Sequence, residues 1–296
     1  MKPLTWGYST ALVNEALASN GLSQFLSELE TFNSALLRLD QLMFLLEDPT
    51  VTKSAKVSTI SDILANKTSQ LTKLGILFAV RTERSSNLVE TLQEIQKKSA
   101  LHSESWMETG SEPSSSRQVA RDRMIGYTKF YCDYTTDGNE LDKVEDEVFG
   151  FARAVEKNSQ LRWTLADLVI PVETRLALVN DILKNAREIT KKLSRYVLLA
   201  GRMRDVVSAL DEIAAEISRE RGRRIAEVRT AVELTTEQKE KLIQNLTQSE
   251  QIPIELRVVV EPELIAGIVL TVGNKMLDTS FRSKFSEMSQ ELYDAV

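Results

Sequence analysis

This chain repeats itself: a stretch that begins near residue 7 recurs 119 residues later, from residue 126 onward. Matches occur at polar as well as apolar positions, and after a one-residue deletion they continue to residues 95 and 213. The matched residues include Gly7, Tyr8, Asn20, Glu28, Asp62 and Ile95 in the first stretch and Gly126, Tyr127, Asn139, Glu147, Asp181 and Ile213 in the second. Helical periodicity alone would not reproduce polar matches at one fixed offset. The sequence therefore predicts two copies of one domain, here called the first copy and the second copy.

Each copy has the pattern of a helical bundle. From Leu22 onward, apolar residues of the first copy recur at steps of three and four, which is typical of a helix with one buried stripe. Pro49 ends this pattern because proline cannot continue the backbone hydrogen bonds of a helix. At the start of the second copy, KFYCDYTTDG contains β-formers, aromatic residues and a glycine. We therefore expect the first helix of the second copy to be the shorter or more frayed one.

A segment rich in serine separates the copies. It lacks helical periodicity, so we expect a linker over residues 101–125, between a bundle at 1–100 and a second bundle at 126–218. Trp106 stands out within this segment, and we expect it to pack onto a neighbouring domain.

The remaining residues, 219–296, change from helical to mixed patterning. IAEVRTAVEL alternates like a strand, and Thr235 with Gln238 forms a capping-box signature that opens a helix. IELRVVV and residues 264–272 follow as strands, and residues 276–279 return as a short hairpin arm. A final helix should carry an apolar face made of Phe281, Phe285, Met288 and Leu292. The predicted fold class is mainly α: two tandem helical bundles followed by a small α+β domain in the order β-α-β-β-α.

Composition excludes several kinds of chemistry. His102 and Cys132 are the only histidine and cysteine and lie in unrelated contexts, which disfavours zinc sites and His-dependent nucleophilic catalysis. The glycine-rich phosphate-binding motifs are missing, and acidic runs such as Glu145-Asp146-Glu147 are typical of solvated helix faces. A net charge of −6 disfavours general nucleic-acid binding. We expect no catalytic residue, cofactor or metal, and the lone cysteine and short apolar runs indicate a soluble cytosolic chain.

The stretch VEPELIAGIVLTVGNKMLDTSFRSKF resembles the C-terminal signature of the delta subunits of F-type ATP synthases, the family of the oligomycin-sensitivity-conferring protein. The residues that fit the family pattern are Pro262, Leu264, Ile265, Gly267, Gly273, Asp278 and Ser280. Glu261, Ala266 and Thr279 depart from it, and Thr279 matters most because a β-branched residue disfavours positive φ. ELDKVEDEVFGFARAVEKNSQLRWTLAD is similar to the longer actinobacterial delta subunits, which carry a doubled N-terminal domain.

The resemblance implies a non-catalytic stator subunit. Such a subunit links the catalytic alpha/beta head to the b subunit of the peripheral stalk, so that the head does not turn with the central stalk. The sheet domain would hold the stalk, and an N-terminal helix of an alpha subunit would bind a groove between the first and fifth helices of a bundle. In this chain the groove residues would be Tyr8, Leu12, Val13, Ala16, Leu71, Leu74 and Phe78. The expected location is the cytoplasmic face of the cell membrane, reached only through the complex.

Two other interpretations stay open from the sequence. One is a helical scaffold or adaptor unrelated to ATP synthase. The other is an enzyme that uses carboxylates alone, which would require two acids in an apolar pocket with separated pKa values. The sequence also leaves open which copy binds the head, how the domains are placed, what the linker does, and which residues touch the b subunit.

Overall fold

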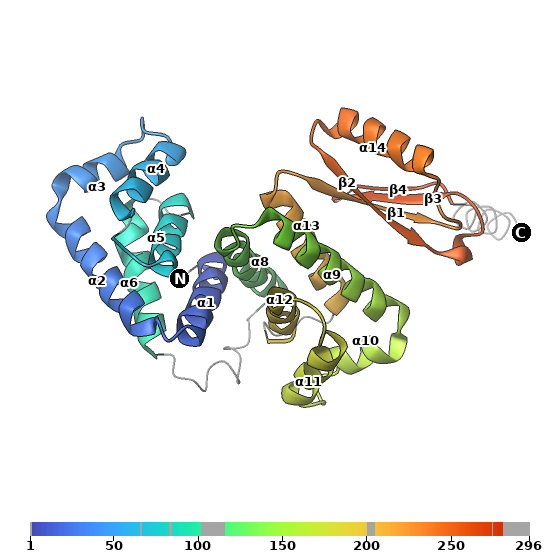
Figure 1. The fold of residues 1–296 in the computed structure, drawn as a ribbon, viewed down its shortest axis with the longest axis horizontal. Coiled ribbons are helices and arrows are strands. Elements are labelled where there is room, and N and C mark those ends of the chain that lie inside the picture. Colours follow the sequence, from blue (N-terminus) through green and yellow to red (C-terminus); the bar gives the residue numbers. More distant parts are fainter. Residues whose placement is uncertain are drawn as a thin grey trace, which may run out of the picture. The chain divides into compact units, whose positions relative to one another are not determined.

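The computed structural model describes residues 2–65, 67–82, 85–101, 116–199, 205–273 and 275–280. The chain divides into two compact units, residues 1–214 and residues 215–296 (Figure 1). The first unit contains both helical copies, and the second contains the sheet.

The helices of the first copy are α1 (Pro3–Ala18), α2 (Leu22–Arg38), α3 (Asp40–Glu47), α4 (Lys53–Leu64), α5 (Gln70–Thr82) and α6 (Ser85–Leu101). The predicted stripe of α2 is buried at Phe25, Leu29, Phe32 and Leu36. Helix α4 begins where the Thr52 hydroxyl accepts a hydrogen bond from the amide of Ala55, which satisfies one free donor of the first turn.

The helices of the second copy are α8 (Arg117–Tyr134), α9 (Gly138–Lys157), α10 (Ser159–Ala166), α11 (Val172–Ile182), α12 (Glu188–Leu199) and α13 (Val206–Glu220). They follow one another in the same order as α1 to α6. The first and last residues of α10 lie 119 positions after those of α3. The prediction of two tandem helical bundles is confirmed.

The start of the second copy differs from the sequence-based expectation. Helix α8 begins at Arg117, inside the range 101–125 taken as the linker, because the Ser116 hydroxyl caps it and Ala120 and Met124 are buried. Helix α8 has 18 residues and α1 has 16, so α8 is not the shorter helix overall. At the offset of 119, α8 begins five residues earlier than α1 and also ends three residues earlier, at Tyr134, so the expected shortening is confined to the end within KFYCDYTTDG. Trp106 lies outside the described residues.

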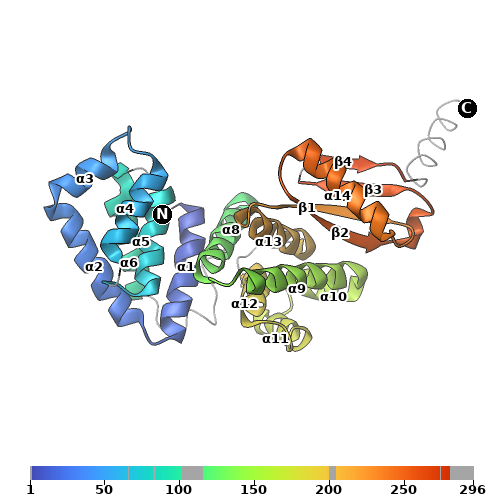
Figure 2. The same ribbon diagram turned by 45° about the horizontal axis from the view of Figure 1, so that its top comes forward.

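The second unit is a four-stranded sheet with a helix on it. Its elements are β1 (Arg224–Thr230), α14 (Thr236–Glu250), β2 (Ile254–Val260), the 3₁₀ turn η1 (Pro262–Leu264), β3 (Ile268–Val272) and β4 (Lys275–Asp278). The strand order is β2-β1-β3-β4, with β1 and β2 parallel and the other two pairs antiparallel. The parallel pair requires a crossover, which α14 provides (Figure 2).

Local signals in the sequence account for much of this unit. The predicted capping box is present, with Thr235 and Gln238 each bonding the other's backbone amide. Leu246 of α14 packs against a small core made of Ala226, Ile254 and Val272. The predicted final helix, with Phe281 and the residues that follow, lies outside the described residues.

Candidate partner-binding surfaces

The structure brings together the residues predicted to form a helix-binding groove. Tyr8 of α1 stacks on Phe78 of α5, with ring centroids 3.6 Å apart and planes 13° apart. The Tyr8 hydroxyl also lies 3.4 Å from the carbonyl oxygen of Leu74. Leu12, Val13 and Ala16 are fully buried, as is Tyr8, whereas Leu71 and Leu74 are half-buried. Tyr8, Leu74 and Phe78 are therefore neighbours, and five of the seven predicted residues are buried.

Helix α8 of the second copy covers Tyr8, whereas Leu12 lies against Gly75 of α5 within the first copy. Figure 1 shows α1 and α8 side by side, and the two backbones touch at Gly7 and Gly126. A Cβ atom added to Gly7 would lie 1.7 Å from the carbonyl oxygen of Arg123, and one added to Gly126 would lie 1.9 Å from that of Leu4. Only glycine permits this approach.

Polar contacts surround the crossing on the side of the first copy. The Tyr8 hydroxyl donates to a carboxylate oxygen of Asp133 at 2.9 Å, and the guanidinium of Arg81 forms an ion pair with the same carboxylate. The Tyr8 ring meets Phe130 edge-on, with centroids 5.4 Å apart. Burial, followed by the nearby Asp133 carboxylate, raises the pKa of Tyr8 well above its usual value, so the hydroxyl stays a donor.

A matching set of contacts lies on the side of the second copy. Tyr127 of α8 stacks on Tyr196 of α12, with centroids 3.9 Å apart and planes 4° apart. The Asn14 amide donates to the Tyr127 hydroxyl at 3.4 Å. The Tyr131 hydroxyl donates to a Glu15 carboxylate oxygen at 2.8 Å, and Lys192 forms an ion pair with this carboxylate.

Sequence reasoning missed this interface between the copies. The pair Gly-Tyr recurs at the same position of both copies, at residues 7–8 and 126–127. This repeated glycine inside a helix was the one sequence feature that indicated the interface. A helix interior disfavours glycine by about 1 kcal/mol, so its presence at the same place in both copies indicates a close approach. Glu15, Lys192, Arg81 and Asp133 gave no comparable signal, because charged residues on a helix are usually solvated.

Exposed aromatic residues mark one further surface in each copy of the helical unit. Phe44 of α3 is 75% exposed and Trp163 of α10 is 72% exposed. The two residues occupy the same position in the two copies, 119 residues apart. Ile63 of α4 and Ile182 of α11 are also exposed and are likewise equivalent. Large exposed apolar side chains of this kind are candidate anchors for a protein partner.

The signature residues of the second unit secure the loop between β2 and β3 against the end of β4. Gly267 has φ +88°, and a Cβ there would lie 2.4 Å from the carbonyl oxygen of Thr279. The Thr279 amide and hydroxyl both donate to the carbonyl oxygen of Ile268, at 2.9 and 3.0 Å. Asp278 accepts a hydrogen bond from the amide of buried Ser280 at 2.8 Å, and the bonds from Ser280 lower the pKa of Asp278.

The other signature residues shape the same loop. Pro262 opens η1, and Leu264 is buried beneath it. Ile265 has φ +66° and is exposed, and Gly273 has φ +58° at the turn between β3 and β4. Among the described residues, Thr279 is not one of those with positive φ, so the departure from the family pattern creates no strain there. The signature residues therefore shape this loop and its contact with the end of β4.

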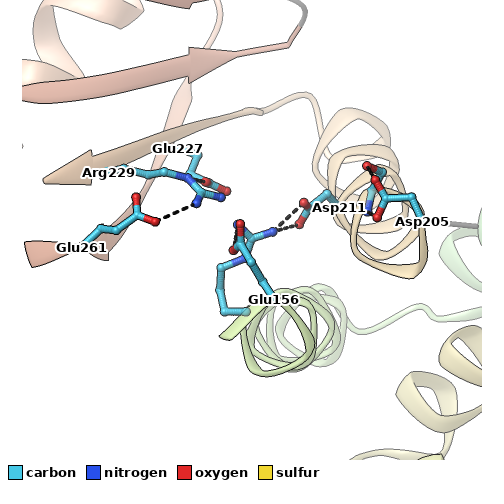
Figure 3. Close-up of polar contacts among 8 residues, drawn as sticks. Glu156, Asp205, Asp211, Glu227, Arg229 and Glu261 are labelled. Atoms are coloured by element: carbon cyan, nitrogen blue, oxygen red, sulfur yellow. Dashed lines mark hydrogen bonds and ion pairs between the residues drawn. The ribbon is translucent and has the colours of Figure 1, made fainter. Parts of the chain in front are cut away.

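In the clusters of Figure 3, neighbouring carboxylates form ion pairs with a shared arginine. In the sheet unit, Arg229 lies between Glu227 and Glu261, at 2.7 and 3.6 Å. In the helical unit, Arg153 binds Asp211 at 2.5 Å and Glu156 at 2.8 Å. These carboxylates are charge-compensated, which differs from the acid pair in an apolar pocket that a carboxylate-only enzyme would need.

Within the residues that the structure describes, no group of three or more His, Cys, Asp or Glu side chains is placed to hold a metal ion. Among the helices described, none is long and apolar enough to cross a bilayer.

Comparison with known proteins identifies relatives. A delta subunit of ATP synthase from Nocardia farcinica is 29% identical over 157 residues, covering 53% of this chain and 58% of that protein. The delta subunit from Limosilactobacillus reuteri (strain DSM 20016) is 28% identical over 167 residues, covering 56% of this chain and 93% of that protein. A subunit b-delta from Mycobacterium sp. (strain KMS) is 30% identical over 159 residues, covering 53% of this chain and 35% of that protein.

The extent of these matches differs. This chain spans little more than half the length of the Nocardia relative. A chain of the Toxoplasma gondii mitochondrial ATP synthase hexamer matches 58% of this chain and 97% of its own length, at 16% identity and a TM-score of 0.37, too low to bear on function. The family model described as ATP synthase delta (OSCP) subunit matches residues 5–106 and 126–292, which is most of the chain. The chain therefore belongs to the ATP synthase delta (OSCP) subunit family.

Proposed function

We propose that this chain is a non-catalytic stator subunit of an F-type ATP synthase, which joins the catalytic alpha/beta head to the b subunit of the peripheral stalk. Family membership over most of the chain is the observation that carries the proposal. The Mycobacterium relative, whose name combines b and delta, supports a close association between these two subunits. Such a joint must withstand repeated load without doing chemistry, which requires buried apolar anchors rather than a reactive site. The subunit then belongs to the cytoplasmic face of the membrane, attached through the complex.

The two units suggest a division of labour. We assign the helical unit to the head and the sheet unit to the b subunit, as the family resemblance implies. The seven groove residues, from Tyr8 to Phe78, stay a prediction for the contact with an alpha-subunit helix. Binding of a partner helix in this groove requires α8 to move, because α8 packs on Tyr8, which stacks on Phe78.

Phe44 and Trp163 are therefore the first choice for the contact with the head. They are exposed while the groove residues are covered, and they recur at one position in both copies. An aromatic side chain of this size contributes a large apolar area to an interface at a low entropic cost. The groove is the second choice.

The test is a tagged pull-down from gently solubilised native membranes, with co-purifying subunits identified by mass spectrometry. Recovery of alpha, beta and b subunits supports the stator role. Recovery of this chain alone, when a tagged beta subunit brings down the whole complex, contradicts it and favours the unrelated scaffold.

Variants then locate the contact. The double variant Phe44→Ala with Trp163→Ala should lower the recovery of alpha and beta while b is retained. Val232→Ala, at an exposed apolar position of the sheet unit, is the matched control and should leave the head bound. If the double variant recovers alpha and beta normally, the groove becomes the preferred candidate for the contact with the head.

A further inference from the structure

The α1–α8 interface is reciprocal, because each residue meets the counterpart of its own partner. Gly7 touches residue 123 and Gly126 touches residue 4, which are equivalent at the offset of 119. Tyr8 bonds residue 133 and Tyr127 bonds residue 14, which are also equivalent. The two first helices thus cross about a pseudo-two-fold axis, and each fills the groove of the other copy. In shape, this is the self-complementary surface of a symmetric dimer.

Such a surface could in principle pair two first copies, or two second copies, from different molecules. What separates these pairings is charge. Two ion pairs cross the interface, Arg81 with Asp133 and Lys192 with Glu15, and neither has an equivalent on the other side of the axis. The contacts agree in shape and differ in charge.

The equivalence of α5 and α12 follows from repeated contacts. Glu28 accepts a hydrogen bond from the amide of Ser69, and Glu147, its counterpart, accepts one from the amide of Arg187. Phe78 and Tyr196 stack in the same way under Tyr8 and Tyr127. Across these helices the offset is therefore 118 residues, so Leu74 corresponds to Lys192 and Arg81 to Leu199.

Pairing two first copies would leave a buried charge without a partner. Glu15 is 8% exposed and is held by Tyr131 and Lys192. In such a pair their places would be taken by Leu12 and Leu74, which neither donate a hydrogen bond nor carry a charge. A buried carboxylate without either partner strongly disfavours the assembly.

Pairing two second copies is also disfavoured. Asp133 would face the position of Leu199 in place of Arg81, and Lys192 would face Tyr134 in place of Glu15. Neither ion pair would form, and both copies of Asp133 and of Lys192 would lack their charged partners at the crossing.

We propose that the α1–α8 surface is a recognition surface for the other copy, in which two ion pairs select first-with-second pairing and reject pairing of like copies. The partner of each groove is then the chain's own second bundle or first bundle. This inference rests on the interface alone and holds whether or not the chain serves as a stator.

The experiment uses the whole chain with a protease site placed in the Ser-rich segment, residues 103–115. After folding and cleavage, native mass spectrometry and size-exclusion chromatography report which fragments stay together. We expect a one-to-one complex of the two unlike fragments. Separation into folded single fragments, or recovery of like pairs, would overturn the proposal.

Charge variants test the selection. Glu15→Lys should weaken the association of the cleaved fragments about 100-fold or more, since the buried Glu15 carboxylate is replaced by a charge of the same sign as that of Lys192. Adding Lys192→Glu should restore it, which a general folding defect would not allow. Lys191→Glu on the same helix is the control, because Lys191 pairs with Glu188 within α12. Equal weakening by the control, or no recovery in the double variant, would refute selection by charge.

Discussion

At the scale of single residues, this chain uses glycine for two different purposes. Gly7 and Gly126 allow two helix backbones to touch, whereas Gly267 combines a left-handed φ with a close approach to Thr279. Gly150, in the middle of α9, has nothing within 4 Å of an added Cβ. Substitution at these positions should therefore have opposite effects.

Gly7→Ala is expected to destabilise the helical unit by about 1–3 kcal/mol or more, because the methyl group overlaps the carbonyl of Arg123 and forces α1 from α8. Gly150→Ala is expected to stabilise it by about 0.5–1 kcal/mol, because alanine is the better helix former. Urea denaturation followed by circular dichroism measures both. Equal behaviour of the two variants would show that the helices do not touch at Gly7.

Comparing Gly267→Ala with Gly222→Ala separates the steric overlap of a new side chain from the backbone strain of a positive φ. Both glycines have positive φ, but only Gly267 has backbone atoms within reach of an added Cβ. Both variants should lose about 1 kcal/mol from backbone strain, and Gly267→Ala should lose more. The measurement is the thermal unfolding of the sheet unit. A loss no greater than that of Gly222→Ala would rule out the packing of Gly267 on Thr279.

At the scale of elements, the same carboxylate brace recurs in both copies. Glu28 of α2 receives hydrogen bonds from Ser69, and Glu147 of α9 receives them from Arg187 and Thr190 at the start of α12. Burial raises the pKa of Glu147, but the bonds from Thr190 and Arg187 outweigh it and leave the pKa below its usual value. The brace fixes the second helix of each copy to the fifth.

This brace predicts a pH dependence. Because the folded pKa of Glu147 is depressed, its stabilising effect is present above the unfolded pKa, near 4.5, and is lost as pH falls through the folded value. Glu147→Gln should lower the melting temperature at pH 7, and the difference from the parent chain should shrink below about pH 4. Glu173→Gln, at an exposed position of α11, is the control. A difference that persists unchanged to pH 3 would exclude ionisation as the cause.

How far the sequence predicted these elements depends on where their signals lie. The stripe from Phe25 to Leu36 and the capping box at Thr235 are local, and both were predicted correctly. The start of α8 was missed because residues 117–125 directly follow the Ser-rich segment, and the burial of Ala120 and Met124 that stabilises this start is set by tertiary packing. The groove residues were named from the family resemblance and stay a prediction, and that resemblance does not reveal that α8 packs on Tyr8.

At the scale of the whole molecule, two compact units behave as separate parts of one chain. The first copy and the second copy lie in the same unit, joined by α1 and α8. Shared burial of this kind couples their unfolding, whereas the sheet unit has its own core.

Leu92→Ala and Leu210→Ala test that coupling, because they are equivalent and fully buried leucines of the two copies. Each should cost about 2–5 kcal/mol and shift the same calorimetric transition, leaving the transition of the sheet unit in place. If each variant shifted a different transition, the copies would be independent domains.

The split of charges across the α1–α8 crossing also has a historical consequence. A chain that doubles starts with two identical halves, each able to stand alone or to pair with its twin. Once Glu15 lies in one half and Lys192 in the other, two like halves no longer complete each other's ion pairs, so each half favours the unlike one. Loss of one half would expose the apolar surface around Tyr8 and Phe130, which the packing of the two copies now covers.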